Sequence, residues 1–333
     1  MEKLRIAVIG LGWFGEIHCD AISAVPELQL AGLCTRTPSR LKALGHKYNV
    51  SALYTDYKEL LEDSTIDVVS IATQWDEHVE PALAALAAGK HVLLEKPMAS
   101  TVDDCIRLCE AAKSASGALM VGHVCRFNPR FMAAKREIET GKIGTIVSLS
   151  ARRNMPAMWT SETLNKIGPI SSNIVHDIDM MLWLTATKVV RVYAQTVSVR
   201  GLKNPDIGQV MLKFDTGATA TLESVTCMPE NTPFDIDERM EVIGTDGLVH
   251  VQDTFPNISI VSKDGFASPD TTYWPTLHAK MRGALPDEFA YFAQCIIEKR
   301  EPNIITPEEA MEATRVALAA EQSAVSGKVV LLE

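Results

Sequence analysis

The sequence predicts an α/β domain with a doubly wound parallel sheet, followed by an α+β domain with a large, mostly antiparallel open sheet. Up to about residue 124, short apolar strands alternate with helices, and a glycine-rich turn follows the first strand. Beyond that point the strands alternate in polarity and are joined by tight turns. Because 333 residues are comfortable for two hydrophobic cores, the predicted domains are residues 1–124 and 125–333.

The first predicted domain consists of apolar runs of strand length and of segments with helical spacing. The predicted strands are 5–10, 28–34, 67–73, 91–96 and 118–124, and the predicted helices are 15–25, 38–48, 56–63, 78–89 and 101–116. Strands separated by helices need crossover connections, so we expect a parallel sheet that is covered by helices on both faces.

The second predicted domain begins with a helix and continues mainly as strands. The predicted elements are a helix over 126–144, strands over 145–154 and 189–199, and hairpins over 208–226 and 238–251. One face of such a sheet is polar in pattern and suits covering helices or a partner subunit.

Composition argues against several classes of function. A formal net charge of −10 disfavours a broad surface for nucleic acid or anionic membranes. No segment approaches the roughly 18 uninterrupted apolar residues of a membrane span, and the short apolar run at the start lacks a signal-peptide cleavage site. Seven scattered cysteines fit neither a disulfide framework nor a zinc cluster. We therefore expect no metal site and a cytoplasmic location.

The turn after the first strand reads "GLGWFG", in which Gly10, Gly12 and Gly15 have G-x-G-x-x-G spacing. The first glycine permits a tight turn, the second lets a pyrophosphate approach the backbone, and the third lets the helix pack closely. The free N–H groups at the helix start then face the phosphates. In this strand–turn–helix context the motif predicts a Rossmann dinucleotide site that includes Trp13 and Phe14. The alternative is that these are turn glycines only.

The end of the second predicted strand bears on the choice of dinucleotide. An acidic residue there would bind the adenosine ribose 2′-hydroxyl and favour NAD(H). The chain instead has "CTRTPSR", with Thr35, Arg36 and Arg40. Hydroxyl and guanidinium groups suit a 2′-phosphate, so NADP(H) is favoured and NAD(H) is the alternative. Both arginines could also be solvated loop residues.

Three motifs together carry a resemblance to a known family. They are "GLGWFG", "AGKHVLLEKPMA" (88–99) and "IVHDIDMMLWL" (174–184). With them the sequence resembles, nearly end to end, the glucose–fructose oxidoreductase/inositol dehydrogenase (Gfo/Idh/MocA) family of NAD(P)-dependent oxidoreductases. The segments 240–251 and 305–332 also look like that family.

The resemblance gives a role to the charged residues after the strand that ends near residue 96. In this family Glu95 and Lys96 would line the nicotinamide ribose, and the peptide bond before Pro97 can be cis. Lys96 would also reach the reacting carbon, where its ammonium group could stabilise developing alkoxide charge. Thr73 would contact the cofactor, although Gln74 stands where the family often has proline. For His18 and His78, a packed histidine and a ligand contact are both open.

The second chemical segment implied by the resemblance is "GPISSNIVHDIDMMLWL" (168–184), in which Ser172 or Asn173 could cap a helix. His176 would act with Lys96 as the group that takes the hydroxyl proton, since the free pKa of histidine lies near neutral. Inositol dehydrogenases carry an aspartate four residues before this histidine, whereas this chain has Ser172. The departure leaves the partner of His176, and the substrate, open.

The substrate side is predicted from further residues after the first domain. Arg126, Arg152, Arg153 and Asn154 could contact a sugar or a phosphate, although the adjacent Arg152 and Arg153 could also be a solvated strand end. Trp159 offers a flat apolar face, and Ser172 and His176 complete the set. "VGHVCRFNP" (121–129) and "HDID" (176–179) look closer to the members that oxidise sugar nucleotides.

The resulting hypothesis is a dehydrogenase that moves a hydride between nicotinamide and a secondary hydroxyl or ketone of a sugar, inositol or sugar derivative. Two alternatives stay open. One is a catalytically silent redox sensor, and the other is a glycoside-cleaving enzyme with a recycled nicotinamide. By analogy with the family we expect a homodimer or homotetramer formed through the second sheet, with no nucleic-acid or membrane partner.

Overall fold

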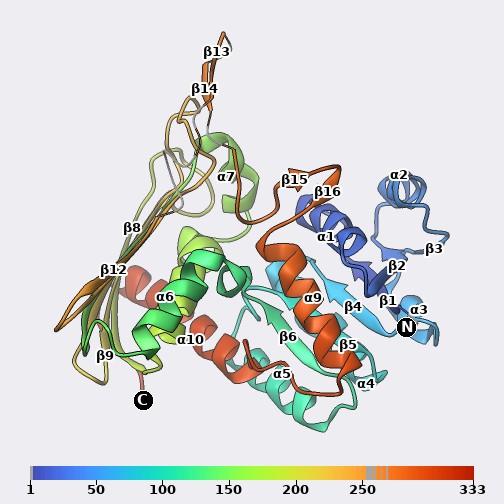
Figure 1. Cartoon of the computed structure of the whole chain (residues 1–333), viewed down its shortest axis with the longest axis horizontal. Coiled ribbons are helices and arrows are strands. Elements are labelled where there is room, and N and C mark those ends of the chain that lie inside the picture. Colours follow the sequence, from blue (N-terminus) through green and yellow to red (C-terminus); the bar gives the residue numbers. More distant parts are fainter. Residues whose placement is uncertain (1–2, 253–257, 259, 264, 268) are drawn as a thin grey trace. The chain divides into compact units, whose positions relative to one another are not determined.

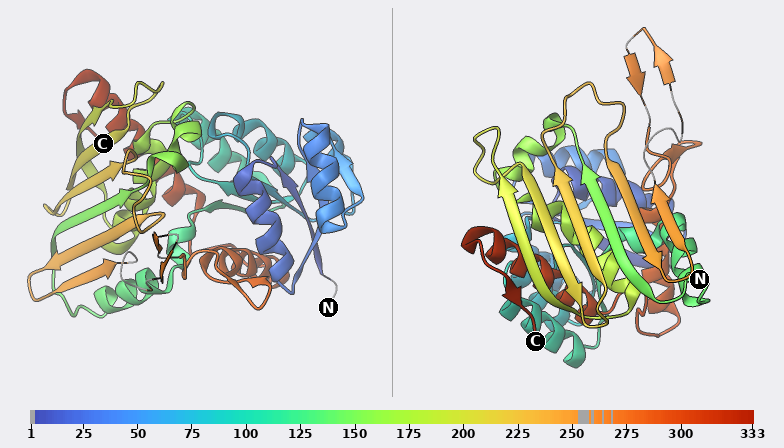
Figure 2. Two further views of the ribbon diagram at one scale, coloured as in Figure 1. Left: turned by 90° about the horizontal axis from the view of Figure 1, so that it is seen from above. Right: turned by 90° about the vertical axis from the view of Figure 1, so that its left-hand side faces the viewer.

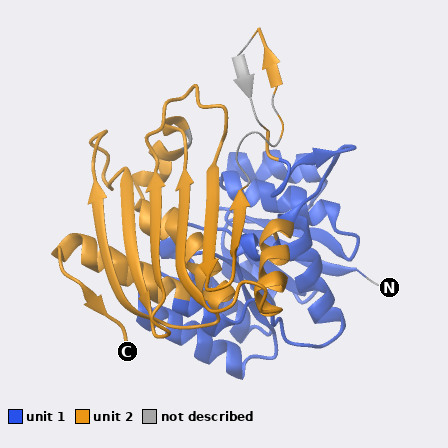
Figure 3. Cartoon of the chain, turned by 60° about the vertical axis from the view of Figure 1, so that its left-hand side comes forward, with its two compact units in different colours: residues 1–127, 271–312 blue, residues 128–270, 313–333 orange. Residues whose placement is uncertain are grey.

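The computed structural model describes residues 3–252, 258, 260–263, 265–267 and 269–333. The chain forms two compact units, which are shown in different colours in Figure 3. Unit 1 comprises Met1–Phe127 and Thr271–Glu312, and unit 2 comprises Asn128–Asp270 and Ala313–Glu333. The chain therefore crosses from one unit to the other three times, and its last crossing lies inside a helix.

Unit 1 is built on a parallel sheet with the strand order β3-β2-β1-β4-β5-β6 (Figure 1). The strands are β1 Leu4–Ile9, β2 Leu28–Cys34, β3 Ala52–Tyr54, β4 Val68–Ile71, β5 His91–Glu95 and β6 Leu119–Gly122. All neighbouring pairs are parallel. The order reverses beside β1, and ligands of open α/β sheets bind at such a reversal, beyond the carboxyl ends of the strands.

Helices connect these strands and bury their apolar faces on the sheet. They are α1 Trp13–Ala24, α2 Pro38–Tyr48, α3 Tyr57–Glu62, α4 Val79–Ala87 and α5 Val102–Ser114, with short 3-10 turns at η1 Trp75–Glu77 and η2 Val124–Phe127. The four residues of β4 and the four of β6 are all buried, as expected for strands covered on both faces. The predicted doubly wound α/β fold is confirmed.

A late segment of the chain returns to unit 1. It contains a small hairpin, β15 Thr276–Leu277 with β16 Lys280–Met281, followed by α9 Ala284–Ile297. The helix packs against α1 and η2, and Phe289 of α9 is 1% exposed. The sequence-based division placed these residues in the second domain. Their local sequence pattern predicts a helix but does not indicate which domain the helix packs against.

Unit 2 is built on a sheet with the strand order β12-β11-β7-β10-β9-β8-β17, whose strands lie side by side in the right view of Figure 2. The strands are β7 Ile146–Asn154, β8 Val189–Val197, β9 Ile207–Phe214, β10 Thr219–Val225, β11 Asp237–Gly244, β12 Leu248–Gln252 and β17 Val330–Leu331. Only the pair β7 and β10 is parallel. The predicted mostly antiparallel sheet and both predicted hairpins are confirmed. A separate hairpin joins β13 Ile260–Ser262 to β14 Gly265–Ala267.

One face of this sheet is covered and the other is not. Val210 and Leu212 of β9 are buried, whereas Met211 between them is 57% exposed. The covering elements are α6 Pro129–Glu139, the π-helical turn η3 Ile170–Ile174, α8 Val175–Thr185 and the second half of α10 Pro307–Ser326. A further helix, α7 Ala157–Leu164, follows β7.

The predicted side-chain cap of the helix at 168–184 is wrong. The residue before α8 is Ile174, which makes no side-chain cap, and the Ser172 hydroxyl donates to Gly168 O at 2.8 Å. The π-helical turn η3 leads directly into α8, so backbone carbonyl groups of the preceding turn replace a capping side chain. In the described part of the chain, no helix is long and apolar enough to cross a membrane.

Candidate active site

The glycine turn of unit 1 has the geometry that its spacing predicts. Gly10 has a φ of +93°, and a Cβ on it would lie 2.7 Å from the backbone of Ala72 and Thr73. A Cβ on Gly15 would lie 1.9 Å from Gly10 O. At Gly12 a Cβ would meet no atom within 4 Å, and α1 starts there without a side-chain cap. A helix start without a side-chain cap, at a glycine with open space beside it, fits a dinucleotide pyrophosphate.

The two predicted arginines that follow β2, Arg36 before α2 and Arg40 within α2, are bound differently. Arg40 donates to Gly12 O at 3.2 Å, to Leu11 O, and to the Glu16 carboxylate at 2.7 Å. Arg36 reaches across to Glu77 of η1, whose two carboxylate oxygens each lie 2.9 Å from its Nη2. Since β2 and β4 flank β1, this second ion pair spans the carboxyl end of β1. The Arg36 side chain is 79% exposed, so a ligand phosphate can reach it.

At the end of β4, Thr73 and His78 form a hydrogen-bonded pair. Nδ1 of His78 lies 3.0 Å from the Thr73 hydroxyl oxygen, and the histidine is 1% exposed. Burial lowers the pKa of His78 to about 4, which outweighs the opposite effect of the Glu95 carboxylate. The imidazole is therefore neutral at pH 7. It acts as a hydrogen-bonding group that orients Thr73.

The Glu95–Lys96 turn follows β5 at the same edge of the sheet. Its Lys96–Pro97 peptide bond is cis, and Lys96 is half-buried. Glu95 is 6% exposed, and both oxygens of its carboxylate have hydrogen-bond partners. Oε1 lies 3.1 Å from Nε2 of His18, and Oε2 accepts from the Lys96 N–H at 3.1 Å. The carboxylate thus has one defined orientation.

Arg126 lies in η2, directly after β6, and is 1% exposed. Its Nη1 donates to Ile304 O at 2.6 Å and lies 3.1 Å from Oε2 of Glu309. These contacts tie η2 to the segment before α10 and to the first turn of α10, within unit 1. A substrate-binding role for Arg126 stays a prediction.

The predicted residues of unit 2 lie at the end of β7 and around η3 and α8. Asn154 accepts from the Val225 N–H at 2.8 Å and donates to Glu223 at 3.3 Å, so its amide joins β7 to β10. Ser172 is buried in η3, and His176 is half-buried in the first turn of α8. Trp159 belongs to α7, and its side chain lies outside the described part of the chain.

An ionic cluster next to His176 was not predicted from the sequence. Arg153 of β7 binds Asp177 through Nη2 at 3.1 Å and through Nε at 3.2 Å, and its Nη2 also binds Glu238 of β11. The three residues are 4%, 1% and 1% exposed. Arg152 is likewise bound, to Asp237 at 2.9 Å. Both guanidinium groups are thus engaged by carboxylates of β11 or α8.

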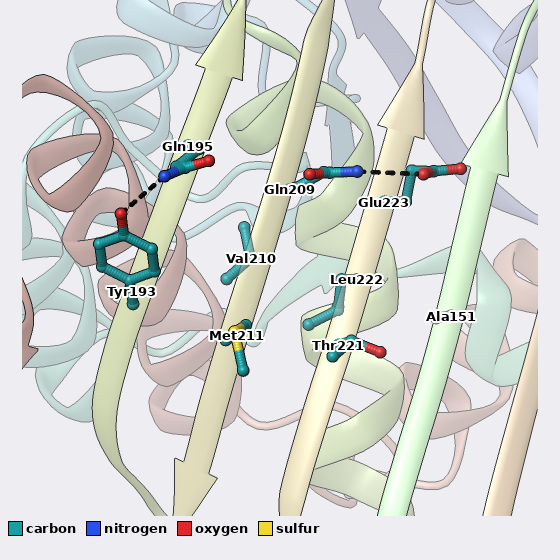
Figure 4. Close-up of a pocket in the computed structure, with 9 residues that line it drawn as sticks. All are labelled: Ala151, Tyr193, Gln195, Gln209, Val210, Met211, Thr221, Leu222 and Glu223. Atoms are coloured by element: carbon teal, nitrogen blue, oxygen red, sulfur yellow. Dashed lines mark hydrogen bonds between the residues drawn. The ribbon is translucent and has the colours of Figure 1, made fainter. Parts of the chain in front are cut away.

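Residues of the unit 2 sheet also line a hollow of about 360 Å³ on its uncovered face. Figure 4 shows four of its polar side chains in two hydrogen-bonded pairs, Gln195 with Tyr193 and Gln209 with Glu223. The hollow contains none of the residues predicted for chemistry. In the described ranges, no group of three histidine, cysteine or acidic side chains is arranged to hold a metal ion.

Comparisons with known proteins cover both halves of the chain. Residues 4–123 match the model of the GFO_IDH_MocA "oxidoreductase family, NAD-binding Rossmann fold", and residues 131–250 match that of the "GFO/IDH/MocA C-terminal domain". An uncharacterized oxidoreductase of Bacillus subtilis, YrbE, is 27% identical over 100% of this chain and 97% of its own. A myo-inositol 2-dehydrogenase of Thermotoga maritima is 26% identical over 99% of each chain.

The fold has also been seen in solved structures. The structure of scyllo-inositol dehydrogenase from Lactobacillus casei, with bound NAD(H) and scyllo-inositol, superimposes with a TM-score of 0.85. It is 21% identical, and the match covers 99% of each chain. At that identity the likeness concerns the fold alone.

Proposed function

The chain belongs to the GFO/IDH/MocA oxidoreductase family, and from this premise we propose that it moves a hydride between C4 of nicotinamide and a secondary hydroxyl or ketone of a sugar, inositol or sugar derivative. It is an NAD(P)-dependent dehydrogenase that acts on CH–OH groups. The observation that carries the proposal is the Glu95–Lys96 turn, which lies at the same sheet edge as the uncapped glycine turn.

The proposed chemistry divides among a few side chains. A bound nicotinamide supplies the hydride acceptor or donor. The Lys96 ammonium would hydrogen-bond the reacting oxygen and stabilise negative charge as the C–H bond breaks. His176 would take the hydroxyl proton during oxidation and return it during reduction. Arg126, Asn154, Trp159 and Ser172 are proposed to hold the substrate.

We propose that NADP(H) is preferred over NAD(H). The support is the absence of a carboxylate at the end of β2 and the presence there of Thr35, Arg36 and Arg40. Arg36 is the residue best placed to meet a 2′-phosphate, because its guanidinium is exposed and held by a single carboxylate, while Arg40 is bound to the glycine turn.

Replacing Arg36 with alanine should therefore weaken NADPH binding by about tenfold, as expected for one charged hydrogen-bonding group at an exposed site. NADH binding should change by less than about twofold, since its ribose carries no phosphate. The measurement is a titration of cofactor-stripped protein followed by nicotinamide fluorescence. Arg107→Ala, which removes an exposed arginine bound to Glu80 and Asp104, is the control. Equal or tighter binding of NADH by the wild type would refute the preference, and no binding of either would refute the dehydrogenase itself.

We also propose that the uncovered face of the unit 2 sheet joins two or four copies of this chain. The support is that large apolar side chains on its strands are exposed: Val197, Met211 and Leu248 are 52%, 57% and 57% exposed, and contact with a second copy would bury them.

A charge on this face should separate the copies. Met211→Glu is expected to reduce the mass measured by light scattering to that of a single chain at micromolar concentration, because it would bury an unpaired carboxylate. Val325→Glu, on α10 where valine is 90% exposed, adds the same charge elsewhere and should leave the mass unchanged. A wild-type chain that is already monomeric would contradict the proposal.

A further inference from the structure

His18 lies beneath the Glu95–Lys96 turn and joins three elements of unit 1. It belongs to α1, three residues after the last glycine of the glycine turn, and is 0% exposed. Nδ1 lies 2.7 Å from the Ser70 hydroxyl oxygen on β4, and Nε2 lies 3.1 Å from Oε1 of Glu95 at the end of β5. The histidine thus links the first helix to two central strands.

Hydrogen positions in this chain of contacts follow from the acceptors. A carboxylate only accepts, so Nε2 of His18 carries the hydrogen that it donates to Glu95. The other ring nitrogen, Nδ1, shares a second hydrogen bond with the Ser70 hydroxyl. The order serine–histidine–carboxylate is that of hydrolase triads, but Ser70 is 0% exposed within β4 and no substrate can reach it. The contacts therefore serve to hold the Glu95 carboxylate in place.

The imidazole itself is fixed by aromatic packing. Phe14, within the glycine turn, lies edge-on to it with ring centroids 4.8 Å apart. Phe289 of α9 lies edge-on at 5.2 Å. Since the ring cannot rotate without displacing one of these residues, its Nε2–H points to one place.

The carboxylate of Glu95 is confined on another side by β6. A Cβ added to Gly122 would lie 2.7 Å from Glu95 Oε1, so a larger residue there would displace the end of the Glu95 side chain. Its second oxygen accepts from the Lys96 N–H. The position of the carboxylate and the course of the turn that carries Lys96 are thereby coupled.

We propose that His18 is a positioning residue that holds the Glu95 carboxylate where the Glu95–Lys96 turn meets the nicotinamide half of the cofactor. This inference rests on the proposed function, in which Glu95 and Lys96 line the nicotinamide ribose. His18 touches neither the reacting atoms nor the adenosine half. Loss of His18 should therefore weaken the contacts of the nicotinamide half of the dinucleotide and leave those of the adenosine half unchanged.

The test compares binding of NADH with binding of ADP, which lacks the nicotinamide and its ribose. A His18→Gln side chain places an amide N–H near the position of Nε2, whereas His18→Asn reaches only the position of Nδ1. By calorimetry, His18→Asn should weaken NADH binding by about tenfold or more, the expected effect of losing one hydrogen bond to a charged group, and ADP binding by less than about twofold. His18→Gln should stay within about threefold of the wild type for both ligands.

Gly122→Ala provides a second variant that leaves His18 in place. Its methyl group would push the end of the flexible Glu95 side chain, so we expect weaker NADH binding with unchanged ADP binding. Parallel losses for NADH and ADP, or equal behaviour of the Gln and Asn variants, would overturn the inference. A wild-type chain that binds ADP and NADH equally would also overturn it, and one that binds neither would overturn the proposed function as well.

Discussion

Replacement of Lys96 by methionine is expected to lower the rate of hydride transfer by about a thousandfold, a typical loss when one group that stabilises transition-state charge is removed. Methionine keeps a flexible apolar chain of similar length and removes only the ammonium group. The dissociation constant of NADH should change by less than about threefold, because the glycine turn and the end of β2 supply the other contacts. Formation of NADH or NADPH at 340 nm, with the substrate of highest turnover, measures the rate.

Lys113→Met is the matched control. Lys113 is an exposed lysine on α5, bound to Glu308, and its replacement should leave both turnover and cofactor binding unchanged. If Lys96→Met lost NADH affinity in parallel with turnover, Lys96 would serve cofactor binding alone and not the chemical step. If turnover persisted, the proposed role of the Lys96 ammonium, which is to stabilise negative charge on the reacting oxygen, would be wrong. A wild-type protein that binds NADH without turnover would instead favour a redox sensor.

The second large effect is expected for stability and comes from Arg153→Met. Arg153 is the shared partner of two buried carboxylates, Asp177 and Glu238. Removing one member of a buried ionic cluster leaves uncompensated charge and typically costs about 3–5 kcal/mol. Urea unfolding at pH 7.5 should show this loss. The change should also lower turnover, because Asp177 directly follows His176.

A variant in which the whole cluster becomes apolar separates the charge effect from packing. In Arg153→Met with Asp177→Leu and Glu238→Leu, the three buried charges of this cluster are removed together, and most of the lost stability should return. If the triple variant were no more stable than Arg153→Met, the uncompensated charge would not be the cause.

The pH dependence of stability follows from the same cluster. Burial raises the pKa of Asp177 to about 6, against the opposing effect of the Arg153 guanidinium and with a further rise from Glu238. Between about pH 4 and pH 6 the folded chain therefore keeps a proton that the unfolded chain has lost. The unfolding free energy should fall as pH rises through this range, and Asp177→Asn should remove that part of the slope. Because Arg153→Met raises the pKa of Asp177 further, its cost should be smaller at pH 5 than at pH 7.5.

Much of unit 1 follows from local sequence patterns. Buried strands such as Val68–Ile71 are continuous apolar runs, and Gly10 and Gly15 occupy positions where a Cβ would strike backbone atoms. The end of each strand then places Thr35, Thr73 and Lys96 at one edge of the sheet. The spacing of apolar residues and the glycine-containing turn predict this arrangement, because the carboxyl ends of parallel strands lie at the same edge of the sheet.

The contacts that join distant segments could not be predicted in the same way. His18 and Glu95 are 77 residues apart, and Arg153 and Glu238 are 85 apart. The sequence around a single histidine or arginine contains no periodic pattern from which its distant partner could be predicted. The segment that carries α9 likewise belongs to unit 1 and packs on α1 and η2, although it follows strands β7–β12 of unit 2 in sequence. The π-helical turn at Ile170–Ile174 was not predicted either. It continues directly into α8, so the predicted capping residue does not lie at the start of that helix.

Hydride transfer itself is the most direct test of the proposed function. Wild-type protein and Lys96→Met would be incubated with NADP⁺ or NAD⁺ and a panel of myo-inositol, scyllo-inositol, free sugars and sugar nucleotides, and absorbance at 340 nm would be recorded. We expect the wild type to form one reduced nicotinamide for each molecule of at least one substrate oxidised, and Lys96→Met to form almost none. A wild-type protein that binds the dinucleotide but never changes its redox state, in either direction and with every member of the panel, would contradict the assignment of a dehydrogenase.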